Sequence, residues 1–210
     1  MNARLIVLDV DSTVITSEVI ELIAARAGTQ NEVAAVTEAA MRGEIDFAES
    51  LRQRVATLEG VPDTVFAEVI DEVRFTPGAE ELISTLQAEG WTAALVSGGF
   101  AEVVETLAGR LGITWFRANR LEVADGRLTG RTVGPVIDRA AKAVALRDYC
   151  AELGIDPADA VAVGDGANDL DMMAAAGLGI AFNAKPVVQD QADVAINEPS
   201  LAAVLDVVRR

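Results

Sequence analysis

Short apolar runs separated by longer amphipathic segments dominate the sequence. The runs are continuous rather than alternating, which is typical of strands in a parallel sheet covered on both faces. We expect strands at Leu5–Leu8, Thr92–Val96, Thr114–Phe116, Ala160–Val163, Gly179–Phe182 and Val194–Ile196. Helical periodicity follows at Ala79–Glu89, Ala101–Leu111, Arg139–Leu153, Leu170–Ala176 and Leu201–Val208. Strands alternating with helices predict an α/β fold with a doubly wound, parallel sheet.

Two segments depart from this alternation. Residues 15–74 show only helical periodicity, so we expect an inserted all-α cap there and a Rossmann-like core made of residues 1–14 and 75–210. Leu121–Val133 alternates around Asp125-Gly126, a strong signal for a two-residue turn. The sequence therefore also predicts a small β-hairpin that projects from the sheet.

Charge and composition narrow the chemistry. With 17 basic and 33 acidic residues the net charge is −16, which disfavours nucleic acids and anionic membranes as partners. The absence of histidine excludes Ser-His-Asp and Cys-His catalysis and ordinary histidine zinc sites. The single Cys150 lies in an apolar helical pattern and is interpreted as a buried hydrophobe. The start of the chain does not look like a signal peptide, and no apolar run approaches the ~20 residues of a membrane span, so we expect a cytoplasmic protein.

Polar residues follow several of the expected strands, at the edge where open α/β sheets bind ligands. These residues are Asp9, Asp11 and Thr13 after the first strand, Ser97-Gly98-Gly99 after the second, and Asp165, Asn168 and Asp169 after the fourth. Several carboxylates at one edge need compensation, and hard oxygen ligands suit Mg²⁺. Taken alone, each has a plainer interpretation: a polar turn at Asp9, a helix N-cap at Ser97, and a solvated surface side chain at Lys142.

Taken together, these motifs occur in the order Asp-x-Asp-x-Thr, Ser, Lys, Gly-Asp-Gly-x-Asn-Asp. In this order the chain resembles the haloacid dehalogenase-like superfamily of phosphatases over its whole length. The resemblance implies that Asp9 is a nucleophile that forms an aspartyl-phosphate and that Asp11 is the general acid and base. It also implies Mg²⁺ bound by Asp9, Asp165 and the backbone carbonyl of Asp11. The remaining implied roles are phosphate binding by Ser97, Gly98, Gly99, Lys142 and Asn168, and support by Thr13 and Asp169.

The helical insertion resembles that of the phosphoserine phosphatases. The matching segments are Asp9–Val14 with Glu18, Met41-Arg42-Gly43 with Phe47, and Ser50–Val55; in the core, Ala181-Phe182 with Ala184-Lys185-Pro186 also resembles that family. The resemblance implies that Glu18 binds a substrate ammonium, that Arg54 binds a carboxylate, and that Met41 and Phe47 shield the amino-acid backbone. Solvated helix residues and cap core are the plainer interpretations. Val10 departs from the family, which commonly has an aromatic residue there.

The resemblance implies hydrolysis of L-phosphoserine to L-serine and phosphate, in serine biosynthesis. Two alternatives remain open at this stage. One is a related phosphatase or phosphotransferase acting on another small phosphate ester, for example with homoserine as acceptor. The other is a receiver-like domain that accepts a phosphoryl group without turnover. We also expect a bare catalytic unit without an amino-terminal regulatory domain, and the sequence leaves its oligomeric state open, a homodimer included.

Overall fold

A seven-stranded sheet forms the centre of the molecule in the computed structural model, which describes residues 4–41 and 44–209. The strand order is β4-β3-β2-β1-β5-β6-β7, and every neighbouring pair is parallel except β3 with β4. The strands are β1 (Arg4–Leu8), β2 (Trp91–Phe100), β3 (Trp115–Ala124), β4 (Arg127–Val133), β5 (Ala160–Gly164), β6 (Leu178–Phe182) and β7 (Val194–Ile196). The predicted doubly wound α/β fold is confirmed.

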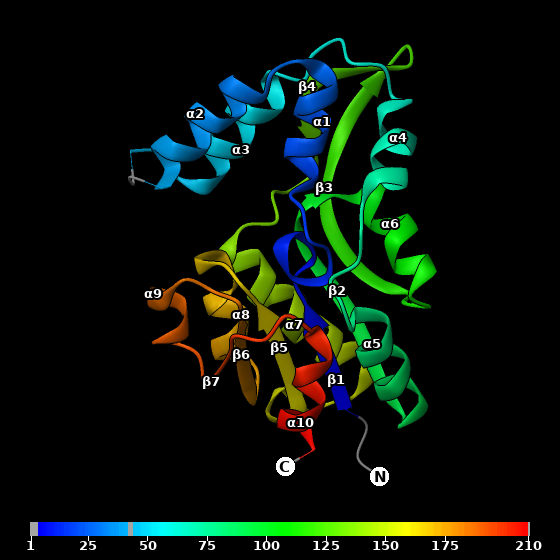
Figure 1. Cartoon of the computed structure of the whole chain (residues 1–210), viewed down its shortest axis with the longest axis vertical. Coiled ribbons are helices and arrows are strands. Elements are labelled where there is room, and N and C mark those ends of the chain that lie inside the picture. The colour runs from blue at the N-terminus through cyan, green and yellow to red at the C-terminus, as the bar shows by residue number, and fades with distance from the viewer. Residues whose placement is uncertain (1–3, 42–43, 210) are drawn as a thin grey trace.

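Ten α-helices surround this sheet in the described part of the chain (Figure 1). They are α1 (Val19–Ala27), α2 (Gln30–Met41), α3 (Phe47–Ala56), α4 (Val65–Glu72), α5 (Ala79–Ala88), α6 (Ala101–Arg110), α7 (Arg139–Leu153), α8 (Leu170–Ala175), α9 (Pro186–Gln189) and α10 (Val204–Val208). Helices α5 and α6 cover one side of the sheet, and α7 and α8 cover the other (Figure 1). Within the described ranges, no helix is both long enough and apolar enough to cross a membrane.

The alternation of side chains along β1 decides which face receives each residue. Leu5 and Val7 pack in the apolar cluster formed with α7 and α8, whereas Ile6 and Leu8 pack in the cluster formed with α5 and α6. Because side chains alternate along a strand, the next residue on the α7 side is Asp9. The strand therefore delivers a carboxylate to the edge of the sheet beneath α7.

Helices α1 to α4 all fall between residues 15 and 74, beyond the carboxyl end of β1 (Figure 1). The two chain segments that lead to them run side by side and pair with each other. The backbone N–H of Thr16 donates to the carbonyl of Arg74 at 3.1 Å, and that of Thr76 donates to the carbonyl of Val14 at 2.9 Å. These bonds hold the entry and exit of the helical segment together.

The predicted hairpin is present, but it does not stand apart from the sheet. Strand β3 runs without interruption from Trp115 to Ala124, so the separately expected strand Thr114–Phe116 and the first arm of the hairpin are one strand. Asp125 and Gly126 both have positive φ, at 50° and 72°, as the two-residue turn requires. Strand β4 then pairs with β3 as the edge strand of the same sheet, instead of projecting from it as expected.

The hairpin also contacts the loop that follows α3. The N–H of Gly60 donates to the carbonyl of Leu128 at 2.8 Å, and the N–H of Leu128 returns a bond to Val61 at 2.8 Å. Asp63 adds a third backbone bond, of 3.0 Å, to the carbonyl of Gly126. The helical segment is thus joined to the sheet at the hairpin as well as at its two chain crossings.

Candidate active site

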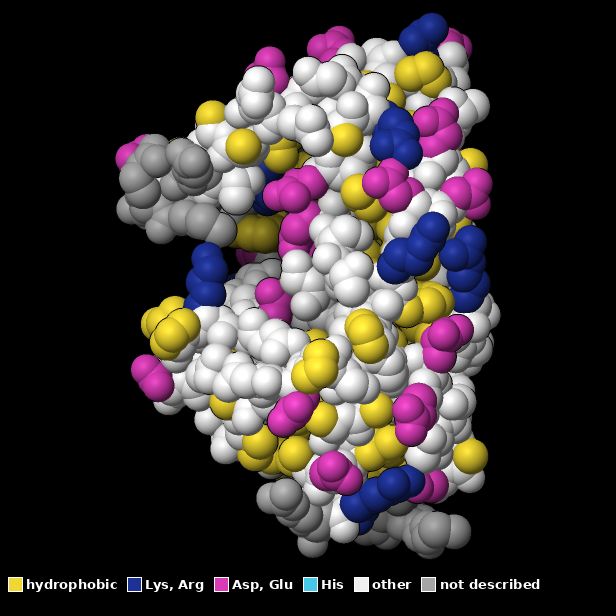
Figure 2. Space-filling model, in the orientation of Figure 1, with side chains coloured by type: hydrophobic (Ala, Val, Ile, Leu, Met, Phe, Trp, Pro, Cys, Tyr) yellow, Lys and Arg dark blue, Asp and Glu magenta, His cyan; other side chains and the backbone are white. Residues whose placement is uncertain are grey.

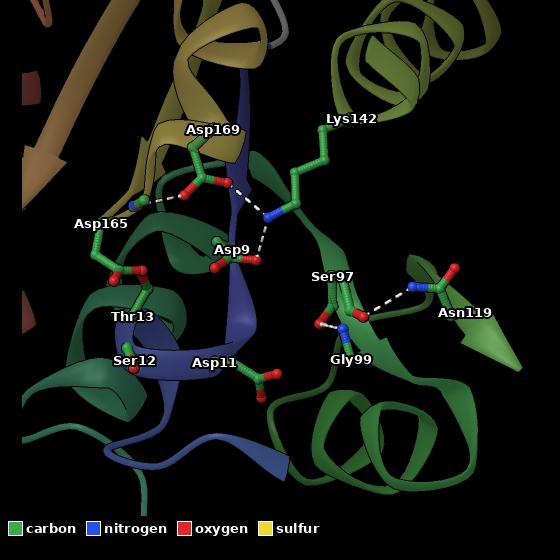
Figure 3. A network of polar contacts seen from close by, with 12 residues as sticks. Asp9, Asp11, Ser12, Thr13, Ser97, Gly99, Asn119, Lys142, Asp165 and Asp169 are labelled. Atoms are coloured by element: carbon green, nitrogen blue, oxygen red, sulfur yellow. Dashed lines mark hydrogen bonds and ion pairs between the residues drawn. The ribbon is translucent and has the colours of Figure 1, made fainter. Parts of the chain in front are cut away.

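Asp9 lies at the carboxyl end of β1 and is 5% exposed. Its backbone N–H donates to the carbonyl of Val163 at 2.9 Å, which continues the pairing of β1 with β5 beyond the strand. On its side chain, Oδ1 accepts a hydrogen bond of 2.6 Å from Lys142 Nζ (Figure 3). Burial, followed by the neighbouring charge of Asp169, raises the pKa of Asp9 well above its usual range, although Lys142 acts in the opposite direction.

Lys142 is fully buried in the first turn of α7. Asp138 caps this helix by accepting a bond of 2.8 Å from the N–H of Ala141, which fixes where the first turn begins. Lys142 Nζ lies 2.6 Å from both Asp9 Oδ1 and Asp169 Oδ1. Burial alone would lower the pKa of Lys142, but the two carboxylates outweigh burial and raise it. The ammonium therefore stays charged in the interior.

Asp169 is fully buried and holds Lys142 from the other side. Its second oxygen accepts a hydrogen bond of 3.0 Å from the N–H of Gly166. Gly164 makes this arrangement sterically feasible, because a Cβ there would lie 2.4 Å from Asp169 Cγ. A glycine is needed at this strand end so that the carboxylate can fold back over the backbone.

Asp165 completes the acidic cluster. Ligand oxygens of Asp9, Asp165 and Asp169 all lie within 4.8 Å of one another. Thr13 donates to Asp165 Oδ1 at 3.1 Å, which gives this threonine a supporting contact. Burial and the charge of Asp169 raise the pKa of Asp165 to about 6.

This cluster suits a divalent cation. When all three carboxyls are ionised, they and the Lys142 ammonium leave two uncompensated negative charges in a largely buried place. Carboxylate oxygens are the ligands that hard divalent ions prefer, and such an ion would neutralise that excess. Asp169 already binds Lys142 and Gly166, so Asp9 and Asp165 are the side chains best placed to hold the metal. The carboxylate of Asp11 lies outside this cluster in the described structure.

Asp11 belongs to the irregular helical turn Val10–Val14 that follows Asp9. It is 9% exposed, and its Oδ1 accepts a hydrogen bond of 3.4 Å from the N–H of Val19 at the start of α1. Burial, followed by the charge of Glu18, raises the pKa of Asp11 well above its usual range. A carboxyl with a raised pKa can hold a proton near neutral pH and release it to a leaving group.

Ser97, Gly98 and Gly99 occupy the last part of β2, where the prediction differs from the structure. The strand was expected to end at Val96, but β2 continues through the two glycines to Phe100, and α6 then begins at Ala101, where helical periodicity was expected to begin. Ser97 is fully buried, and its Oγ accepts a hydrogen bond of 2.8 Å from the N–H of Gly99. A Cβ on Gly99 would lie 2.8 Å from Asp11 Oδ2, so this backbone passes directly beside the Asp11 carboxylate (Figure 3).

The expected residues converge on a cavity of about 140 Å³. Its lining includes Asp9, Asp11, Glu18, Phe47, Arg54, Gly98, Gly99, Asp165 and Asn168. The cavity is also lined by Ile20, Leu51, Phe100 and Gly166, for which no binding role was predicted. Because these residues are apolar or glycine, their sequence patterns do not differ from those of ordinary core residues and turns. Lys142, Ser97, Thr13 and Asp169 lie around the same site through the contacts described above, whereas the side chain of Met41 lies outside the described residues.

Glu18, just before α1, and Arg54, on α3, bring opposite charges to this cavity. Glu18 is the residue before α1, and its Oε1 accepts a hydrogen bond of 2.7 Å from the hydroxyl of Ser12. Ser12, for which no role was predicted, has a positive φ of 58°, which is uncommon for a residue other than glycine. Arg54 Nε donates to the carbonyl of Ser50 at 3.3 Å. The two charged groups provide one acceptor and one planar donor for a small zwitterionic ligand.

A wider cavity of about 780 Å³ opens outward from this site. It shares Glu18, Phe47, Arg54, Asp165 and Asn168 with the small cavity and extends to Arg139 and Lys185. Figure 2 shows the molecule hollowed between the part that carries α2 and α3 and the part that carries α8 and α9. Small molecules can therefore enter between the helical segment and the sheet.

Comparison with known proteins agrees with this architecture. The family model for haloacid dehalogenase-like hydrolases matches residues 6–174. "Phosphoserine phosphatase SerB2" of Mycobacterium tuberculosis is 55% identical over 96% of this chain and 49% of its own length. A phosphoserine phosphatase of Streptococcus thermophilus is 48% identical over 97% of this chain and 95% of its own length. A solved structure titled as a phospho-aspartyl intermediate analogue of phosphoserine phosphatase has a TM-score of 0.93 and 41% identity, and the match covers 99% of this chain and 100% of that one.

The chain belongs to the haloacid dehalogenase-like hydrolase family, within the group whose curated members are called phosphoserine phosphatases. The resemblance found in the sequence is thereby confirmed. The chain spans about half the length of the first curated relatives that it matches, at 49% of each.

Proposed function

We propose that this protein hydrolyses L-phosphoserine to L-serine and inorganic phosphate through an aspartyl-phosphate on Asp9. The observation that carries the proposal is that one cavity of about 140 Å³ contains Asp9, Asp11, Glu18 and Arg54 together. A site of this size and charge accommodates a small amino acid that bears a phosphate. The names of the curated relatives support the same substrate.

Asp9 is the nucleophile in this proposal. Lys142 donates its hydrogen bond to Oδ1 of Asp9, and Oδ2 of Asp9 has no hydrogen bond to another described residue. In the first step Oδ2 bonds to phosphorus, and the bond between phosphorus and the serine oxygen breaks. Asp11, whose pKa is raised by burial and by the charge of Glu18, gives its proton to the departing alkoxide. In the second step Asp11 takes a proton from water, the water oxygen bonds to phosphorus, and the bond to Asp9 breaks.

Charge balance in these steps depends on Lys142, Ser97 and a metal. Lys142 and Ser97 bind phosphoryl oxygens, with Gly98, Gly99 and Asn168 beside them, and Asp169 keeps Lys142 in place. We propose Mg²⁺ as the metal, held by Asp9, Asp165 and the backbone carbonyl of Asp11. When bound, Mg²⁺ supplies positive charge that stabilises the phosphoryl group as negative charge develops.

Recognition of the amino acid falls to the helical segment in this proposal. Residues 15–74 form a cap, and residues 1–14 and 75–210 form the catalytic core. Glu18 binds the substrate ammonium, Arg54 binds its carboxylate, and Phe47 and Met41 shield the substrate from water. The cytoplasmic location and a homodimeric state remain predictions.

A phosphate-release assay tests the proposal. The substrates are phosphoserine, phosphothreonine and sugar phosphates, each with Mg²⁺ and with EDTA. We expect a preference for phosphoserine, loss of activity in EDTA and recovery on adding Mg²⁺. Asp9→Asn should lower turnover by several orders of magnitude while the circular dichroism spectrum stays unchanged. A single phosphorylation without release would indicate the receiver-like alternative, and transfer to added homoserine would indicate a phosphotransferase.

Matched variants on α3 test the assignment of the substrate. Arg54→Ala should raise KM for phosphoserine strongly, because the substrate carboxylate loses its donor. Arg52→Ala is the control, since Arg52 lies on the same helix, is exposed and pairs with Glu49 outside the cavity. Equal kinetics in the two variants would rule out Arg54 as a substrate ligand.

A further inference from the structure

The end of β2 contains a bulge whose backbone is held by a residue of the next strand. Ser97 pairs with Ala118 of β3, and the next pair is Phe100 with Asn119. Three steps along β2 therefore match one step along β3, and Gly98 and Gly99 have no partner in the ladder. Bulges of this kind redirect the backbone and leave its polar groups without sheet hydrogen bonds.

Asn119 supplies the missing partner from the far side of the bulge. It is 1% exposed, and its Nδ2 donates to the carbonyl of Gly98 at 2.8 Å (Figure 3). Its Oδ1 accepts a hydrogen bond of 2.8 Å from the N–H of Ile137, the residue before the Asp138 cap of α7. Because one partner only accepts and the other only donates, they fix which way round the carboxamide lies.

The direction of the Gly98 carbonyl determines the direction of the next N–H. A trans peptide is planar, so its C=O and N–H point in opposite directions. With the carbonyl of Gly98 turned to Asn119, the N–H of Gly99 points the other way, to Ser97 Oγ at 2.8 Å. Since Ser97 Oγ accepts from Gly99, the serine's own hydroxyl hydrogen is available for a different acceptor.

There is no room for a side chain at position 98 or 99 that would restrict rotation of this peptide. A Cβ on Gly98 would lie 3.1 Å from Phe47 Cζ, and one on Gly99 would lie 2.8 Å from Asp11 Oδ2. Two consecutive glycines are conformationally permissive, so the peptide between them would rotate readily without an external hydrogen bond. The restraint must therefore come from outside the segment, and Asn119 provides it.

We propose that Asn119 is a positioning residue that holds the Gly98–Gly99 peptide so that Ser97 presents its hydroxyl hydrogen to a phosphoryl oxygen. The inference rests on the proposed function, because it requires that Ser97 binds phosphate. Asn119 itself touches neither substrate nor metal in this proposal. Its second bond, to Ile137, ties the same carboxamide to the start of the helix that carries Lys142, so two phosphate-binding elements share one brace.

The test measures the affinity for inorganic phosphate in the presence of Mg²⁺, by isothermal titration calorimetry. The proteins are wild type, Asn119→Ala, Ser97→Ala and the double variant. We expect Asn119→Ala to weaken phosphate binding about tenfold in the wild-type background, the scale of one hydrogen bond to a charged group. In the Ser97→Ala background it should have almost no further effect, because the group that it positions is gone.

Tyr149→Phe is the matched control. The hydroxyl of Tyr149 is buried and donates to the carbonyl of Leu95 at 3.3 Å, so this variant also removes a hydrogen bond to the β2 backbone. Leu95 precedes the bulge along β2, so the loss of this bond leaves the Gly98–Gly99 peptide in place and phosphate affinity should stay unchanged. An equal loss in Tyr149→Phe and Asn119→Ala would show that Asn119 acts only through the general stability of the sheet, and would overturn the inference.

Asn119→Asp is the second variant, in case Asn119→Ala does not fold. An ionised carboxylate would face the Gly98 carbonyl, whereas the protonated acid could donate to it. The phosphate affinity of this variant relative to wild type should therefore rise as pH falls from 8 to 5.5, and a constant ratio would overturn the inference. If Asn119→Ala lowers phosphate affinity equally in the wild-type and Ser97→Ala backgrounds, the inference about Asn119 is overturned and the proposed function is not. Failure of the wild-type protein to bind phosphate would overturn the proposed function and this inference with it.

Discussion

Replacing Lys142 with methionine should destabilise the fold strongly, because one buried ammonium serves two buried carboxylates. Lys142 and Asp169 are fully buried, and Asp9 is 5% exposed. Removing one partner of a buried ion pair typically costs about 3–5 kcal/mol, because an uncompensated charge remains. Here two carboxylates are left at 2.6 Å from the lost nitrogen, so we expect a loss at the upper end of that range. Such a loss is a large fraction of the ~5–15 kcal/mol that stabilises a typical domain.

Urea denaturation of the metal-free protein measures this loss, with Arg139→Met as the control. Arg139 lies one turn earlier on α7 and pairs with Asp171 at 2.5 Å, but both side chains are more than two-fifths exposed. Exposed pairs contribute ~0–1 kcal/mol, so the control should change the free energy of unfolding little. A loss in Lys142→Met as small as in Arg139→Met would refute the reasoning.

The pH dependence of the same measurement gives a second check. Without the ammonium, the pKa of Asp9 in the folded state should lie further above its unfolded value, because Lys142 lowers that pKa in the wild-type protein. A carboxyl with a raised folded pKa binds more protons when folded, so its destabilising effect grows as pH rises from about 4 toward the folded pKa. The deficit of Lys142→Met should therefore be smaller at pH 5 than at pH 7.5, and Asp169→Asn should recover part of it. A deficit independent of pH would contradict the electrostatic explanation.

Three further predictions follow from the site. Mg²⁺ affinity, measured by calorimetry, should fall as pH drops below about 6, because the raised pKa of Asp165 means that metal must then displace a proton; equal affinity at pH 5 and 7 would contradict this. Gly164→Ala should cost about 1–3 kcal/mol in urea denaturation and reduce turnover, since its Cβ would meet Asp169, whereas Gly109→Ala in the exposed last turn of α6 should be neutral or stabilising. Ser12→Ala should raise KM for phosphoserine more than for a phosphate ester without an amino group, because Glu18 loses its 2.7 Å hydrogen bond, and an equal rise for both esters would contradict that role.

The acidic edge of the sheet was predictable because its residues are local in sequence to apolar strands. Asp9 follows four apolar residues, and Asp165 and Asp169 follow Ala160–Val163. Parallel strands bring such ends together regardless of the details of packing. The arrival of Lys142 between Asp9 and Asp169 was harder to predict, because a lysine in a first helical turn has the same local pattern whether it is buried or solvated.

The bulge at the end of β2 could not be derived from the sequence. Two glycines before an apolar helix are typical of a turn, and nothing local distinguishes a turn from a strand that continues through Phe100. Asn119 likewise lies in a polar stretch between a short apolar run and a hairpin, where an asparagine suggests a turn. Its role depends on Gly98 and Ile137, which are 21 and 18 residues away along the chain. Contacts of this length depend on strand register, which side-chain patterns specify only coarsely.

The three backbone hydrogen bonds between the hairpin and the loop after α3 constrain the mechanics of the whole molecule. The helical segment is attached to the sheet both at its two chain crossings and at the hairpin. Two attachments that lie apart leave it only one axis about which it can rotate relative to the sheet. Any displacement of α3 from the sheet must therefore break the bonds at Gly60, Leu128 and Asp63 or bend β3 and β4 along with it. The hairpin therefore restrains any widening of the entrance to the cavity.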